Sequence, residues 1–204
     1  MGFYEFAKSA VKLYYKIFYR IEVEVIENIP KENGFIVSAN HKSLNDPPLL
    51  AAVLPIKFRF MAKEELFENK IFGAALRSFG AFPIKRGKND IAALRAAIEI
   101  LSNKENLMIF PEGARSPKGH MHKGKPGTAL IAIKSKVKIL PVGIDGEYKL
   151  FSRIKIRVGK PISLEEYYDE RLRSEKLQQI TEERLMPAIS QLSGVSTYED
   201  RDSR

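Results

Sequence analysis

The alternation of apolar and polar residues along the chain predicts a series of short strands. In residues 21–27, Ile21, Val23 and Val25 alternate with glutamates, as in a strand with one buried face. Further runs of strand length are residues 34–39, 57–62, 81–84, 107–110, 138–144 and 153–158. The run at 138–144 contains Pro141, which cannot donate a ladder hydrogen bond, so we expect an edge or bulged strand there.

Helical periodicity fills most of the intervals between these strands. In residues 89–102, for example, Ile91, Leu94 and Leu101 fall on one helical face. The other helix candidates are residues 48–54, 69–79, 127–136 and 164–192, the last interrupted at Pro187. Because strands and helices alternate, we expect one α/β domain with a largely parallel sheet flanked by helices. This domain is expected to span residues 21–192, followed by a frayed tail at 193–204.

An amphipathic helix is predicted before this domain, at residues 3–20. Its lysines recur every four positions and form one basic stripe, whereas most of its other residues are apolar or aromatic. Three lysines inside a bilayer would cost about 2.5–3.5 kcal/mol each, so a spanning helix is disfavoured. At the interface the same lysines would contribute roughly 1 kcal/mol each with anionic lipid. The residues expected to contact a membrane are Phe3, Phe6, Lys8, Lys12 and Lys16.

The same segment also fits a helix that docks on the domain's own core, and the sequence leaves both interpretations open. In the membrane interpretation, residues 1–20 form an amphipathic membrane-interface helix. The protein would then be peripheral on the cytoplasmic face of the cell membrane.

Charge and cysteine content restrict the chemistry. Residues 161–204 carry ten acidic and six basic residues, so the net charge of +9 places +13 on residues 1–160. Such a field favours anionic partners, which include nucleic acids, phospholipid headgroups and phosphorylated substrates. The absence of cysteine excludes disulfides, zinc–thiolate sites and thiol nucleophiles.

The segment "NHKSLNDPP" at residues 40–48 has two interpretations. Asp46 precedes Pro47, so its carboxylate could cap the helix that the proline starts. Alternatively, the turn could fold Asp46 back onto one ring nitrogen of His41, which would leave the other nitrogen as a general base. Taken alone, this spacing favours the capping interpretation, because a single His and Asp form a weak motif.

Two more strand ends carry candidate binding residues. "GAFPIKRG" at 80–87 delivers Lys85 and Arg86 just before a predicted helix, although a solvated basic loop is the more common outcome. "LMIFPEGARSPKG" at 107–119 presents Arg115 after a Pro-Glu-Gly turn. Arg115 could hold a phosphate with its planar fork, or it could form a local ion pair with Glu112.

The segments "NHKSLNDPP", "GAFPIKR", "FPEGARS" and "ILPV", in this order, resemble the four blocks of the glycerolipid acyltransferase family. The closest branch is the PlsC-type lysophosphatidic acid acyltransferases. The blocks span residues 40–142, about half of the chain. Each block is short, but their order and spacing together favour the catalytic interpretation of His41.

The resemblance assigns roles by position. The matched residues are His41 and Asp46 in the H-x4-D catalytic dyad, Arg86 in the second block, and Glu112, Gly113 and Arg115 in the third. The second and third blocks are implied to bind the acyl acceptor. Its phosphate would lie on Arg86 and Arg115, with Lys85, Lys123 and Lys125 as weaker candidates. Ala114 departs from the family pattern, which usually has Thr at this position.

The resemblance implies transfer of a fatty acyl group from acyl-CoA or acyl carrier protein to the sn-2 hydroxyl of 1-acyl-glycerol 3-phosphate. The product would be phosphatidic acid, a precursor in phospholipid biosynthesis. No cofactor or metal is expected, and His120 and His122 are interpreted as loop residues. A G-x-S-x-G elbow is absent from the sequence, so direct attack by the hydroxyl is favoured over an acyl-enzyme.

Three alternatives remain open at this point. The first is a related enzyme that acylates glycerol 3-phosphate or another lysophospholipid. The second is a basic nucleic-acid-binding domain, and the third is a membrane-binding adaptor in which His41 and Asp46 have no catalytic role. The second is disfavoured, because the aromatic residues concentrate at helical spacing near the start of the chain instead of alternating with basic residues along strands.

Overall fold

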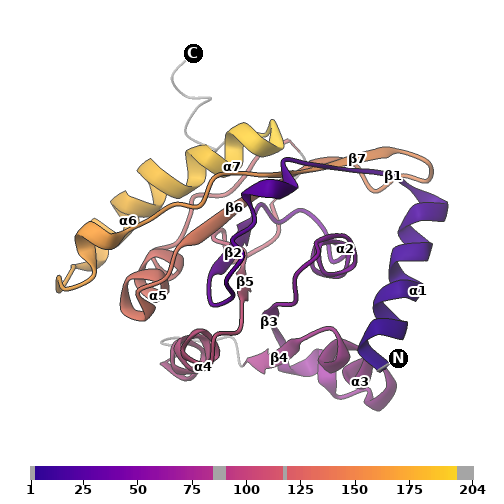
Figure 1. Cartoon of the computed structure of the whole chain (residues 1–204), viewed down its shortest axis with the longest axis horizontal. Helices are drawn as coiled ribbons and strands as arrows, with labels where there is room; N and C mark the ends of the chain where they lie inside the picture. The colour runs from indigo at the N-terminus through magenta and orange to yellow at the C-terminus, as the bar shows by residue number, and fades with distance from the viewer. Residues whose placement is uncertain (1–2, 85–90, 117–118, 197–204) are drawn as a thin grey trace.

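The computed structural model describes residues 3–84, 91–116 and 119–196 of the 204-residue chain, with side chains from residue 8 onward except at residue 72. Seven strands form one sheet in the order β1-β7-β6-β2-β5-β3-β4. Helices lie on both sides of this sheet (Figure 1). The strands are β1 (Arg20–Glu24), β2 (Ile36–Ala39), β3 (Arg59–Lys63), β4 (Ala81–Ile84), β5 (Leu107–Ile109), β6 (Ile139–Gly146) and β7 (Arg153–Val158).

The helices alternate with the strands, as the sequence pattern predicts. The α-helices are α1 (Phe3–Phe18), α2 (Asp46–Val53), α3 (Lys70–Ser78), α4 (Ile91–Ser102), α5 (Gly127–Ser135), α6 (Ser174–Ile180) and α7 (Met186–Ser193). Short 3-10 segments are η1 (Ile26–Asn28), η2 (Glu64–Phe67) and η3 (Glu165–Tyr167), and η4 (Thr181–Leu185) is a π-helical segment.

Strand direction brings the candidate site together. Strands β6, β2, β5, β3 and β4 pair in parallel, whereas β7 pairs antiparallel with β6 and parallel with β1. The carboxyl ends of the five parallel strands therefore meet at one edge of the sheet, where α/β folds bind their ligands. The predicted α/β domain with a largely parallel sheet and a preceding helix is confirmed.

Two hydrophobic cores lie on opposite faces of the sheet. Helices α1, α2 and α3 contribute to one core, which includes the buried rings of Tyr15 and Tyr19. Helices α4, α5, α6 and α7 contribute to the other. The inner face of α1 packs into a core, so on this face the helix is docked on the domain. Within the described ranges, no helix is both long and apolar enough to cross a bilayer.

The expectation that Pro141 marks an edge or bulged strand is wrong. Strand β6 lies inside the sheet, between β2 and β7. The carbonyl of Pro141 accepts a hydrogen bond from the Gly159 amide at 2.8 Å, on the β7 side, and the ladder with β7 begins only at Val142. The missing N–H of Pro141 therefore faces the end of that ladder, where it interrupts no strand pairing.

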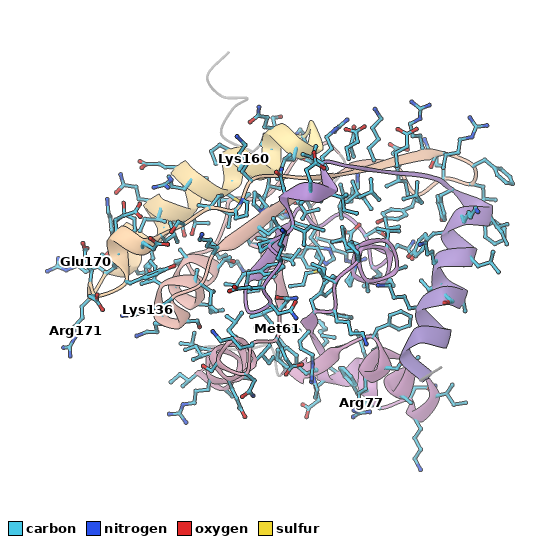
Figure 2. All side chains as sticks on the ribbon, in the orientation of Figure 1. Met61, Arg77, Lys136, Lys160, Glu170 and Arg171 are labelled. Carbon is cyan, nitrogen blue, oxygen red and sulfur yellow. The ribbon has the colours of Figure 1, made fainter. Side chains whose placement is uncertain are left out.

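The predicted helix at 164–192 is corrected in two ways. Residues 168–173 are not helical, and Figure 2 shows Glu170 and Arg171 of this segment at the outer edge of the molecule. From Ser174 to Ser193 the chain is helical without interruption at Pro187. The π-helical segment η4 ends at Leu185, two residues before this proline. A wider turn there accommodates a ring that lacks an N–H and would crowd an α-helical carbonyl.

Candidate active site

The two side chains that the sequence places five residues apart do meet. His41 follows the carboxyl end of β2, and Asp46 is the first residue of α2. His41 Nδ1 lies 2.8 Å from Asp46 Oδ2. Asn45 at the start of α2 makes no side-chain capping bond, and the backbone amides that donate to Asp46 belong to residues before the helix. The capping interpretation of Asp46 is therefore not what the structure shows.

Four donors hold the Asp46 carboxylate in one orientation. Besides the imidazole, Oδ2 accepts hydrogen bonds from the backbone amides of Lys42 and Ser43, both at 2.7 Å. The other oxygen, Oδ1, accepts from the Tyr148 hydroxyl at 2.7 Å, and Asp46 is fully buried. Because Oδ2 is an acceptor, Nδ1 of His41 carries the hydrogen and Nε2 keeps its lone pair.

The imidazole ring is fixed from a second side. It stacks on the Phe110 ring with centroids 4.0 Å apart and planes inclined by 17°. The His41 side chain is 11% exposed. None of the described residues forms a hydrogen bond with Nε2. A ring held by Asp46 and Phe110, with an uncommitted basic nitrogen, can accept a proton from a bound alcohol.

Glu112 ties the end of β5 to the end of β2. Its Oε1 accepts from the His41 amide at 2.7 Å and its Oε2 from the His122 amide at 2.8 Å. The Ser116 amide donates to the His41 carbonyl at 2.7 Å, which adds a second link between the same two loops. Glu112 is 1% exposed. Its carboxylate therefore positions the His41 backbone, and the alternative ion pair with Arg115 is not formed among the described residues.

Burial raises the pKa of Glu112 to about 7, and the two backbone donors only partly offset this. Between about pH 4.5 and 7 the unfolded chain ionises this carboxyl while the folded chain keeps it protonated. Stability contributed by Glu112 should therefore fall across this window by up to about 3 kcal/mol and stay level above it.

Glu112→Gln should remove this pH dependence. We expect the free energy of unfolding of the wild type, minus that of the variant, to decrease between about pH 4.5 and 7. Denaturant titrations at several pH values measure it, and taking the difference cancels all other titrating groups. If the unfolding free energies of the wild type and the variant, plotted against pH, stay parallel across this window, the raised pKa of Glu112 is contradicted.

The Pro-Glu-Gly turn also positions basic side chains. Gly113 has φ +69°, and a Cβ at this position would lie 2.9 Å from the Nζ of Lys125. Glycine therefore allows the Lys125 side chain to lie across the turn. Arg115 is exposed and directly precedes Ser116, whose amide contacts the His41 carbonyl. The structure thus places Arg115 and Lys125 on the loop that contacts His41.

The remaining predicted residues have different outcomes. Lys123 is exposed in the loop between β5 and α5. Lys85 and Arg86 follow β4 but lie outside the described residues. Lys8 donates to the Leu54 carbonyl at the end of α2, at 3.0 Å. Lys12 and Lys16 are exposed on α1, whereas the side chains of Phe3 and Phe6 lie outside the description.

Sequence reasoning missed Tyr148 and Lys42. Burial and the nearby Asp46 carboxylate raise the pKa of the Tyr148 hydroxyl, which keeps it a hydrogen-bond donor. Lys42 Nζ donates to the carbonyls of Ile144 and Gly146 at the end of β6, and burial lowers the pKa of its ammonium. The one available signal for Tyr148 is its place just after a strand, at the edge where the ligand is expected.

A cavity of about 310 Å³ lies at the opposite edge of the sheet from His41, near the starts of β3, β4 and β5. Its lining includes Lys57, Arg59, Arg77 and Lys104. It contains none of the predicted catalytic or phosphate-binding residues. In the part of the chain that the structure describes, no group of three or more His, Cys, Asp or Glu residues could hold a metal ion.

Comparisons with known proteins agree with one another. A family model for acyltransferases matches residues 20–145. The chain is 38% identical to the 1-acyl-sn-glycerol-3-phosphate acyltransferase of Streptococcus pneumoniae, over 68% of this chain and 54% of that protein. It is 30% identical to the protein of the same name from Bacillus subtilis, over 78% of this chain and 82% of that protein. The chain thus spans about half of the first relative and most of the second.

The fold is also similar to a solved structure. The crystal structure of PlsC, the 1-acyl-sn-glycerophosphate acyltransferase from Thermotoga maritima, shares 30% sequence identity with this chain. The TM-score is 0.73, and the superposition covers 93% of this chain and 79% of that one. The solved structure therefore matches most of the fold described above.

Proposed function

Because this chain belongs to the acyltransferase family, we propose that it transfers a fatty acyl group from a thioester to the sn-2 hydroxyl of 1-acyl-glycerol 3-phosphate. The product is phosphatidic acid, formed for phospholipid biosynthesis. The observation that carries the proposal is the 2.8 Å contact between His41 Nδ1 and Asp46 Oδ2, which leaves Nε2 as the base. The names of the relatives support the choice of acceptor.

The proposed chemistry proceeds by direct attack. Nε2 of His41 takes the proton of the sn-2 hydroxyl while the hydroxyl oxygen bonds to the thioester carbonyl carbon. The carbonyl re-forms, the carbon–sulfur bond breaks, and the leaving thiolate takes the proton from the imidazolium. Asp46 stabilises the imidazolium between these two transfers. Proton removal by a positioned imidazole contributes typically about 10²–10⁴-fold to rate.

The acceptor phosphate is proposed to bind at the Pro-Glu-Gly turn. Arg115 is exposed there, and the Lys125 side chain crosses Gly113 on the same loop. A planar guanidinium can hold two phosphate oxygens at once. Lys123 and the second-block residues Arg86 and Lys85 are the further candidates for this headgroup. The acyl donor is proposed to be acyl-CoA or acyl carrier protein.

Arg115→Ala should raise the KM for the lysophosphatidate acceptor by about 10- to 100-fold, because a charge-assisted phosphate contact is lost. The KM for the thioester donor should change little. Initial rates measured against each substrate in turn separate the two values. Arg115→Lys keeps the charge without the planar fork and should fall between the wild type and the alanine variant. A change confined to the donor KM would reassign Arg115.

Acceptor identity is tested by a comparison of lysophosphatidate with glycerol 3-phosphate and with lysophospholipids whose phosphate carries an alcohol. The proposal requires that lysophosphatidate is used most efficiently. The nucleic-acid alternative receives little support, because Tyr15 and Tyr19 pack into the core instead of forming a stacking surface. We place the protein at the cytoplasmic face of the cell membrane, peripherally, because its acceptor is a lipid.

A further inference from the structure

The outer face of α1 exposes large apolar side chains beside basic ones. Leu13, Tyr14 and Ile17 are 57%, 45% and 54% exposed. At 100° per residue they lie on one half of the exposed face, and Lys12 and Lys16 lie on the other half. Burial of Tyr15 and Tyr19 accounts for the inner face only, so the protein's own core does not explain these exposed residues.

A second element adds to this surface at the end of α1. The turn between β6 and β7, residues 147–152, exposes Leu150 by 66% and Phe151 by 64%. The Phe151 amide donates to the Phe18 carbonyl at 2.7 Å, and the Arg20 amide donates to the Ser152 carbonyl at 2.9 Å. The turn therefore lies against the carboxyl end of α1, as Figure 1 also shows.

The apolar tip of this turn includes a residue with an unusual backbone conformation. Phe151 has φ +61°, a left-handed conformation that bulky side chains rarely adopt. Two neighbouring elements thus present large apolar side chains to the outside, where a contiguous patch marks an interaction site. Basic residues lie on the neighbouring elements, Lys12 and Lys16 on α1 and Arg20 on β1, whereas Lys149 in the turn is ion-paired with Glu147 at 2.6 Å.

We propose that Leu13, Tyr14, Ile17, Leu150 and Phe151 form one membrane-docking surface, with the β6–β7 turn as a second insertion element beside α1. Its partner is a bilayer with anionic headgroups, because Lys12, Lys16 and Arg20 are exposed on the elements that carry or adjoin the apolar residues. The inference rests on the proposed function, in which the acceptor is a lipid. It goes further by assigning membrane contact to a turn that the sequence pattern leaves as a gap between two strands.

The docking surface is connected to the catalytic residues. Tyr148, two residues before Leu150, donates its hydroxyl to Asp46 at 2.7 Å. The Tyr15 hydroxyl donates to the Asn45 carbonyl at 3.1 Å, which ties the turn between His41 and Asp46 to α1. Leu44 in that turn is exposed as well. The docking surface is therefore tied by hydrogen bonds to the residues that hold the dyad.

The test uses the full chain and its binding to vesicles without any substrate. The double variant Leu150→Ser and Phe151→Ser should bind at least about 10-fold more weakly, both to phosphatidylcholine vesicles and to an equimolar mixture with phosphatidylglycerol. Lys12→Gln with Lys16→Gln should instead lose the preference for the anionic vesicles. Ile91→Ser is the matched control, since Ile91 is 57% exposed on α4, which packs on the other face of the sheet.

Activity provides a second measurement. The Leu150/Phe151 variant should lose turnover of long-chain lysophosphatidate in vesicles by about the same factor as it loses binding. Turnover of a short-chain lysophosphatidate dissolved in water should be retained. Unchanged vesicle binding would overturn the inference, and so would a variant that changes only self-association in sedimentation. Vesicle binding without acyl transfer by the wild type would instead reject the proposed function and leave the docking surface intact.

Discussion

Replacement of His41 by alanine should lower the rate of acyl transfer by about 10²–10⁴-fold, because the general base is removed. The fold should survive. Only the backbone of His41 contacts Glu112 and Ser116, and alanine keeps both of those hydrogen bonds. The Asp46 carboxylate would still accept from Lys42, Ser43 and Tyr148.

The loss is measured in an assay that detects the free thiol released as the acyl group moves from a thioester to lysophosphatidate. A thermal unfolding curve of the same sample shows whether the variant is folded. Added imidazole should restore part of the rate, because the alanine leaves a ring-sized space between Asp46 and Phe110. A folded variant with full activity would refute the assignment of His41 as the base.

Asp46→Asn is expected to lower kcat by about 10² to 10⁴, with little change in either KM. The amide is nearly isosteric. Its oxygen can accept from His41, Lys42 and Ser43, and its nitrogen can donate to the Tyr148 hydroxyl. The substitution therefore removes the charge that stabilises the imidazolium while the geometry is preserved.

Tyr148→Phe is the graded control for this variant. It removes one of the four hydrogen bonds to the carboxylate and leaves the charge, so kcat should fall by less than about 10-fold. Steady-state kinetics of the two variants, with both substrates varied, give the comparison. If Asp46→Asn raised only a KM, or if Tyr148→Phe were the more damaging change, the proposed role of the carboxylate would be wrong.

The contact between His41 and Asp46 could be predicted because the two residues are only five positions apart. A short segment carries both the residues and the turn that brings them together. Tyr148 could not be predicted in this way, because it lies 102 positions from Asp46 and reaches it only through the β2–β6 pairing. Strand order depends on packing of the whole chain, which a local pattern does not specify.

Glu112 shows a different limit. The Pro-Glu-Gly turn and its place after a strand were predictable, but the direction of the carboxylate was not. Its partners are backbone amides of residues 41 and 122, and one of these is 71 positions away. Every residue except proline has a backbone N–H, so the residue types at positions 41 and 122 could not have indicated that their amides donate to Glu112.

Most element boundaries followed from periodicity, and the exceptions have local causes. Strand β1 ends at Glu24 instead of residue 27, because Val25 adopts φ +60° and η1 begins at Ile26. The expectation for Pro141 was wrong because proline disrupts a sheet only where a neighbouring strand needs its backbone N–H as a donor. Here the ladder with β7 begins after Pro141, so no strand needs that N–H. The helix break predicted at Pro187 does not occur, because the π-helical segment η4 accommodates the proline ring.

The pairing of β1 with β7 has a consequence for synthesis on the ribosome. Strand β1 has its partner only after Arg153–Val158 has been made, some 130 residues after Glu24. At about 5–20 residues per second this interval is roughly 6–26 s. Throughout this interval the basic, aromatic-rich helix α1 can contact α2, but the strand that follows α1 has no partner. If the proposed docking surface binds lipid, translation close to a membrane would bring α1 to that membrane before the sheet is complete.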